Sequence, residues 1–191
     1  MNQYYDPPFW RDGARRAPFN VYTAVAPLRD FLTTRHWDAP KWNLEERPWA
    51  FAEEDMSGAG DSGSMSVWIP YSTDARLMVD WLYDPVRRQY LREQGGRAHR
   101  DADGTQIAAM NVVVLRVRSQ VLDAVGRLRI PAIESSSDTI AATVYSGGRR
   151  IVGKWSADAA SGGFGLRVPS GELMTLLSGT TWIEIANVGV R

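Results

Sequence analysis

His99, Asp101 and Asp103 lie in one short polar stretch that ends at Gly104. Their spacing matches the first half of a calcium loop, where ligands at positions 1, 3 and 5 precede a glycine at position 6. The second half does not match, because position 12 is Met110 and a bidentate glutamate is needed there. We therefore expect no metal site and no cofactor, and predict an Asp-Gly turn whose carboxylates bind the local backbone.

The same stretch has a second chemical interpretation, in which His99 is a general base. Asp101 or Asp103 would orient its ring, as a carboxylate does in many hydrolases. A hydrolase of this kind also needs a nucleophile, and no serine lies in a G-x-S-x-G elbow. These three residues are the catalytic candidates that the sequence offers.

Tryptophan is abundant, with eight residues in the chain. Trp81, Trp155 and Trp182 fall on predicted strands, where large aromatic side chains usually pack into a core. A second set falls outside the predicted elements and could form a ligand-binding or interdomain face: Trp37, Trp42 and Trp49.

Composition excludes several classes of function. The 191 residues include 22 basic and 22 acidic side chains, so the chain has no net charge with which to attract nucleic acid. Cysteine is absent, which excludes disulfides, thiolate metal sites and a cysteine nucleophile. No stretch has the apolar length of a membrane span, and the first residues lack the apolar core of a signal peptide.

The chain divides by composition near residue 60. Residues 1–60 read as a linker or remnant segment with one helix at about 27–35, for which Thr23 is the expected cap. The loop SGAGDSGS at 57–64 separates this segment from residues 65–191, which read as a mainly antiparallel β domain. The predicted fold class is α+β, with a small helical segment before a β-barrel-like or strongly bent sheet.

Alternating and apolar runs predict the strands of this domain. Residues 77–83 and 86–92 alternate on either side of an Asp-Pro turn, and Tyr90 should face inward. The apolar run of residues 111–118 should be a central strand covered on both faces. Gly147 and Gly148 should form a tight hairpin turn between two further strands. The remaining expectations are strands at 64–69, 164–168 and 180–188, a short helix beginning at Ser119, and a core containing Val113, Leu115, Tyr145, Trp155 and Trp182.

Several of these motifs resemble the YerB-like bacterial lipoproteins of unknown function. The resemblance rests on VDWLYDP at 79–85, YLR at 90–92, Gly96-x-x-His99-x-Asp101, Gly104-x-Gln106, NVVV at 111–114, GGRRIVGKW at 147–155 and SGTTWIE at 178–184. Upstream, residues 9–22 are similar to the segment that joins the two domains of that family. Phe19 departs from the pattern, because the family often has histidine there.

The resemblance implies a location and no reaction. The chain looks like the C-terminal half of such a protein, with the N-terminal domain and its lipobox cysteine absent. It implies an extracytoplasmic protein, anchored to the membrane in its full-length form, whose partners are an unknown envelope ligand or protein and the missing N-terminal domain. We therefore expect a non-catalytic binding or scaffold module of the cell envelope. The alternative is an envelope hydrolase that uses His99 with Asp101 or Asp103.

Overall fold

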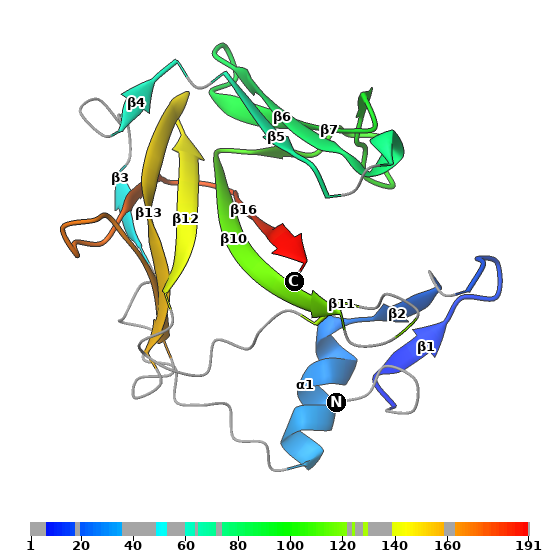
Figure 1. Ribbon diagram of the computed structural model, residues 1–191. Coiled ribbons are helices and arrows are strands. Elements are labelled where there is room, and N and C mark those ends of the chain that lie inside the picture. Colours follow the sequence, from blue (N-terminus) through cyan, green and yellow to red (C-terminus); the bar gives the residue numbers. More distant parts are fainter. Residues whose placement is uncertain are drawn as a thin grey trace. The chain divides into compact units, whose positions relative to one another are not determined.

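The computed structural model describes residues 7–17, 20–35, 49–52, 60–63, 65–71, 74–121, 124, 128–129, 139–158 and 163–190 (Figure 1). The chain forms two compact units, Met1–Trp42 and Asn43–Arg191. Most of the described residues of the second unit lie in strands, and antiparallel pairs predominate. The described strands form open sheets and no closed barrel, so the barrel-like alternative is wrong.

The first unit contains a short hairpin and a helix. Strands β1 (Phe9–Arg11) and β2 (Val21–Thr23) pair antiparallel, and α1 spans Val25–Thr34. The predicted cap is wrong, because Ala24 occupies the N-cap position and the Thr23 hydroxyl donates instead to the carbonyl oxygen of Pro8 at 2.8 Å. That bond ties the end of the hairpin to its beginning.

The second unit contains two main sheets. The large sheet comprises β4 (Asp61–Ser62), β10 (Asn111–Val121), β11 (Leu128–Arg129), β12 (Thr139–Ser146), β13 (Arg149–Asp158), β14 (Gly163–Arg167) and β16 (Thr181–Val190). The small sheet comprises β5 (Ser66–Ile69), β6 (Val79–Asp84), β7 (Gln89–Gln94), β8 (Arg97–Ala98) and β9 (Ala108–Ala109). A separate pair joins β3 (Ala50–Ala52) to β15 (Thr175–Leu177), and a single 3-10 turn covers Ala75–Leu77.

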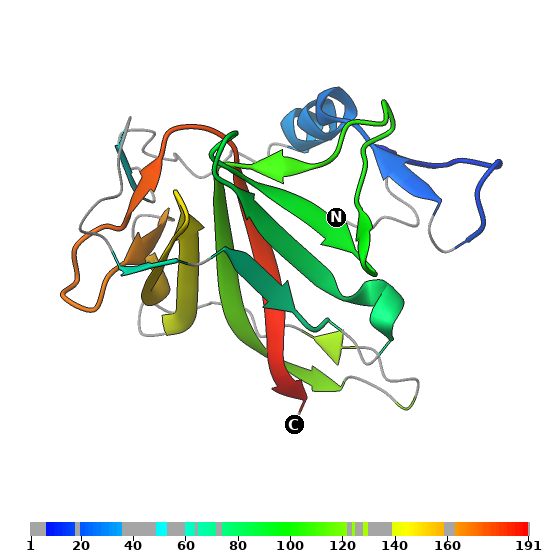
Figure 2. The same cartoon turned by 90° about the horizontal axis from the view of Figure 1, so that it is seen from above.

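Strand β10 is the centre of this unit, as its apolar sequence predicts. It pairs antiparallel with β12 and parallel with β16, and the three strands lie side by side in Figures 1 and 2. In this register Val113 has Val144 on one side and Ile183 on the other. Val113 and Leu115 enter a core with Leu176, whereas Val112 and Val114 enter a second core beneath the small sheet. Both faces of β10 are therefore covered.

The parallel pairing of β10 with β16 is not visible in the sequence. Parallel neighbours are joined by a long connection, and here the intervening chain contains strands β11 to β15. The pair β3–β15 is also parallel. The prediction of a mainly antiparallel domain is confirmed, and parallel pairs occur at these two positions.

Three expected boundaries shift. Leu77 belongs to the 3-10 turn and β6 begins at Val79; Val86 and Arg88 lie in the turn before β7, where Arg88 has a φ of 55°. The helix expected from Ser119 is wrong for its first residues, because β10 continues to Val121. The two compact units are Met1–Trp42 and Asn43–Arg191, and β3 and β4 pair with β15 and β13; the division near residue 60 stays a prediction.

The core prediction holds for its aliphatic members. Val113 and Leu115 are buried, while Tyr145, Trp155 and Trp182 are only partly buried and pack against the edges of the two cores. Their large rings are only partly covered by the two cores, whereas the β10 valines have neighbours on both faces.

The Asn111 side chain joins four segments of the second unit. Its oxygen accepts hydrogen bonds from the backbone N–H of Leu177 at 3.0 Å and from the Ser146 hydroxyl at 2.6 Å. Its amide nitrogen donates to the carbonyl oxygen of Leu177 at 2.8 Å and to the Thr181 hydroxyl at 3.1 Å. Asn111 and Ser146 are both fully buried, so this polar group fixes strand positions.

The hairpin between β12 and β13 confirms the prediction for Gly147 and Gly148. Their φ angles are 58° and 73°, the left-handed pair that a tight primed turn requires. A side chain at Gly148 would also meet the Tyr83 ring. Steric fit and backbone conformation both favour glycine there.

Gly153→Ala should destabilise the second unit by about 1–3 kcal/mol, the usual cost of overfilling a packed site. A Cβ at this position would overlap the Met174 Cε and the carbonyl oxygen of Arg167. Thermal unfolding followed by circular dichroism measures the effect. Gly13→Ala is the control, because nothing lies within 4 Å of a Cβ there. Equal melting temperatures for the two variants would contradict the packing argument.

Candidate functional site

The small sheet and β16 enclose a buried ion pair. Arg92 on β7 and Glu184 on β16 are 7% and 5% exposed, and the Arg92 Nε donates to the Glu184 Oε1 at 3.3 Å. Removing two charges from water is costly, and such pairs persist only when further hydrogen bonds satisfy them. The surrounding residues supply those bonds.

Glu184 accepts from two aromatic residues of the small-sheet region. The Trp81 Nε1 donates to Oε1 at 2.9 Å, and the Tyr71 hydroxyl donates to Oε2 at 2.5 Å. Burial, reinforced by the neighbouring carboxylate, raises the pKa of Tyr71, so its hydroxyl keeps the proton that it donates.

Arg92 lies between aromatic faces and polar acceptors. Its guanidinium carbon is 5.9 Å from the Trp81 ring centroid and 5.5 Å from that of Trp182, within the range of cation–π attraction. The Nη1 donates to the Gln94 Oε1 at 3.1 Å and also contacts the His99 Nδ1. We call Tyr71, Trp81, Arg92, His99 and Glu184 the Arg92–Glu184 network.

His99 is the titratable member of this network. Burial lowers the pKa of its imidazole, the Arg92 charge lowers it further, and the charges of Asp101 and Glu184 oppose the shift. The Nδ1 can accept from Arg92 only while it carries no proton. A protonated His99 would place a second cation against the guanidinium.

Acidification should therefore destabilise the second unit through His99. Because the folded-state pKa of His99 is lowered, the unfolded chain binds the proton more readily, and stability falls as the pH drops below about 6.5. His99→Gln should reduce the dependence of the melting temperature on pH between 7.5 and 5.5. An unchanged pH dependence in this variant would show that His99 does not contribute, since carboxylates titrate in both proteins.

The structure does not assemble the proposed His–Asp arrangement. The His99 ring faces Arg92, whereas the Asp101 and Asp103 carboxylates accept the backbone N–H groups of Ala102 and Thr105 at 2.6 and 2.8 Å. Both aspartates are exposed in the turn. Within the described ranges, no group of three or more histidines and carboxylates is placed to hold a metal ion.

The tryptophans of the suggested ligand face are described only in part. Trp37 and Trp42 lie outside the described residues. Trp49 is partly buried against the core of the large sheet, and its ring is 6.3 Å from that of Phe51 in an edge-on arrangement. Such a contact is typical of a side chain that packs against the core.

The outer face of the small sheet presents a different set of side chains. Trp68 is 58% exposed and Leu82 is 40% exposed. The register places Trp68, Asp80 and Glu93 side by side across β5, β6 and β7. Leu82 and Leu91 form the neighbouring row. An exposed tryptophan beside leucines and carboxylates is typical of a binding surface.

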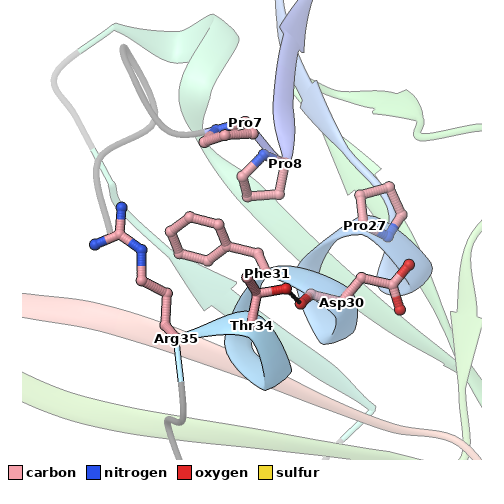
Figure 3. A pocket seen from close by; sticks show the side chains of 7 residues that line it. All are labelled: Pro7, Pro8, Pro27, Asp30, Phe31, Thr34 and Arg35. Atoms are coloured by element: carbon pink, nitrogen blue, oxygen red, sulfur yellow. Dashed lines mark hydrogen bonds between the residues drawn. The ribbon is translucent and has the colours of Figure 1, made fainter.

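The first unit contains a pocket of about 370 Å³ between its hairpin and α1. Figure 3 shows the Phe31 ring pointing toward Pro7 and Pro8, with Arg35 and Asp30 on opposite sides. The Arg35 guanidinium carbon lies 5.0 Å from the Phe31 ring centroid. The pocket combines an apolar interior with a charged rim.

A family assignment follows from the sequence of the second unit. Residues 67–183, which contain every member of the Arg92–Glu184 network except Glu184, match the model of the C-terminal domain described as a protein of unknown function, DUF3048. The chain belongs to this family. The DUF3048 domain thus covers both β10 and the small sheet, and the expected YerB-like relationship is confirmed.

A solved structure shows the same fold. The crystal structure of the YerB protein from Bacillus subtilis is 21% identical, with a TM-score of 0.65 over 94% of this chain. The chain spans 56% of the length of that protein. No curated protein matches the chain. Among the described residues of this DUF3048 protein, no helix has the length and apolar character needed to cross a membrane.

Sequence reasoning missed Arg92 and Glu184, although a signal was present. Arg92 lies two positions after the inward-facing Tyr90, and Glu184 lies two positions after Trp182. In a strand, residues two apart share a face, so the side chains of Arg92 and Glu184 are both expected to point toward the core. A buried charge requires a partner, and the opposite signs identify the pair.

Proposed function

We propose that this chain is a non-catalytic binding or scaffold module of the cell envelope, outside the cytoplasm. The observation that supports binding is the outer face of the small sheet, where Trp68 and Leu82 remain open to solvent beside an edge strand. Aromatic side chains exposed in this way are typical anchors for a partner. The envelope location, with a lipid anchor in the full-length protein, is supported by the resemblance to YerB-like lipoproteins.

The geometry does not favour the alternative hydrolase. A general base must reach a substrate proton and be oriented by an acceptor on its other nitrogen. The His99 Nδ1 faces a cation, and the two aspartates are engaged in their own turn. This arrangement favours a structural role for these groups and supports the outer face of the small sheet as the recognition surface.

Site-specific photo-crosslinking in intact cells tests the binding function. Benzoylphenylalanine introduced at Leu82 should give adducts, and the same residue at Val152 should give few. Val152 is the matched control because it is a strand residue on the large sheet with 49% exposure. Protease added outside the cells should degrade the chain if it lies outside the cytoplasm. Equal adduct yields at the two positions would contradict a binding role for the outer face.

A further inference from the structure

Strand β5 is the edge of the small sheet. Among the described strands it pairs with β6 alone, and it is the short, uncharged sequence SVWI. The backbone N–H of Tyr83 donates to the carbonyl oxygen of Met65 at 2.8 Å, which sets the alternation of hydrogen-bonded pairs along these antiparallel strands. By that alternation, the backbone groups of Ser66 and Trp68 point away from β6. Within the described residues no second strand bonds to them, so they can pair with an added strand.

The outer face beside this edge carries an unfavourable charge pair. Asp80 and Glu93 are direct cross-strand partners on β6 and β7, where side chains begin about 4.5–5.5 Å apart. Like charges in this position destabilise a sheet. In the part of the chain that the structure describes, no basic side chain forms an ion pair with either carboxylate. A cationic side chain from a partner would be attracted to both carboxylates and would offset the repulsion between them.

Trp68 lies next to Asp80 in the same row. Its indole is more than half exposed, so its face is available to a cationic side chain. The order of groups from the edge inward is therefore an open backbone, an aromatic face and two carboxylates. An extended segment can bond to the open backbone. A long side chain with a planar cation at its end can stack on the aromatic face and reach the carboxylates, and arginine has that form.

We propose that Trp68, Asp80 and Glu93 receive an arginine side chain from an extended segment of a partner protein, and that this segment pairs with the free edge of β5. The proposal rests on the proposed binding function and names the chemistry of its partner. The partner's backbone bonds to Ser66 and Trp68. Its arginine lies along the indole and reaches the carboxylates.

The test uses the full chain labelled with ¹⁵N and a capped pentapeptide, acetyl-Val-Arg-Val-Arg-Val-amide. We expect saturable shifts of the backbone amides of Ser66–Ile69 and of the Trp68 indole N–H. A peptide with citrulline in place of arginine keeps the shape and removes the charge, and it should bind at least about 5-fold more weakly. High salt should weaken the arginine peptide more than the citrulline peptide.

Variants of the three residues give the second arm. Asp80→Asn and Glu93→Gln should each weaken peptide binding by about 2- to 5-fold, and Trp68→Thr by a similar factor. Glu172→Gln and Trp10→Ala are the controls, since they alter an exposed acid between β14 and β15 and an exposed tryptophan of the first unit. Without peptide, Asp80→Asn should raise the melting temperature by about 1–3 °C, because it relieves the repulsion with Glu93.

Three outcomes of the peptide titration would overturn the inference. They are equal binding of the arginine and citrulline peptides, shifts that map away from the small sheet, and unchanged binding by the Asp80→Asn/Glu93→Gln double variant. An adduct of twice the mass of the chain in the crosslinking experiment would assign this edge to a second copy and would also overturn it. Adducts between Leu82 and a different protein, without arginine-dependent peptide binding, would support the binding function. They would contradict the proposal that the partner contributes an arginine.

Discussion

Glu184→Gln should lower the free energy of unfolding by about 3–5 kcal/mol. The substitution keeps the shape of the side chain and removes its charge, so the guanidinium of Arg92 stays buried without a counter-ion. Arg92 is 7% exposed and cannot regain its hydration in the folded state. Equilibrium unfolding in urea, followed by circular dichroism, measures the loss as a lower midpoint with an unchanged slope.

A second substitution separates the charge effect from the shape effect. Arg92→Met in the Glu184→Gln background removes the orphaned cation and leaves a thioether against Trp81 and Trp182, a favourable contact. The glutamine oxygen can still accept from Trp81 and Tyr71. The double variant should be more stable than Glu184→Gln alone. If it were less stable, the penalty would not come from an unpaired charge.

Val113→Asp should unfold the second unit. The side chain is fully buried in the central strand, with Val144 and Ile183 as its cross-strand neighbours. An isolated carboxylate there has no partner, and such a group costs several kcal/mol, a large part of the roughly 5–15 kcal/mol that stabilises a typical domain. Loss of amide dispersion in the ¹⁵N spectrum and loss of a cooperative thermal transition would report the unfolding.

The matched control for this prediction is Val152→Asp. Val152 is also a strand valine, but 49% of it is exposed, so an aspartate at this position keeps its hydration. This variant should melt within a few degrees of the wild type. A cooperative transition near the wild-type temperature in Val113→Asp would contradict the central position of β10.

Local patterns in the sequence were sufficient to predict several elements. Consecutive valines predicted that β10 is covered on both faces, and Gly147-Gly148 predicted the tight turn between β12 and β13, because both features depend on residues close together in the chain. The inward position of Tyr90 followed from alternation in the same way. Each of these predictions is confirmed.

The features that were missed depend on residues far apart in the chain. The parallel partner of β10 and the Arg92–Glu184 pair are set by which strands meet, and periodicity gives the face of a side chain without naming its neighbour. Thr23 is not the cap for a related reason, since its hydroxyl donates to the carbonyl oxygen of Pro8, the residue just before the opposite strand β1. The parallel partner of β10, the Arg92–Glu184 pair and the hydrogen bond of Thr23 all depend on which strands pair.

The position of β16 has a consequence for synthesis of the protein. Asn111 and its neighbour Thr181 are 70 residues apart in the chain. At about 5–20 residues per second, a ribosome needs roughly 4–14 s to add that length. Throughout this interval the nascent chain contains the apolar run Val112–Leu115 without its parallel neighbour β16. That run is therefore the segment on which a holdase chaperone would act before translation ends.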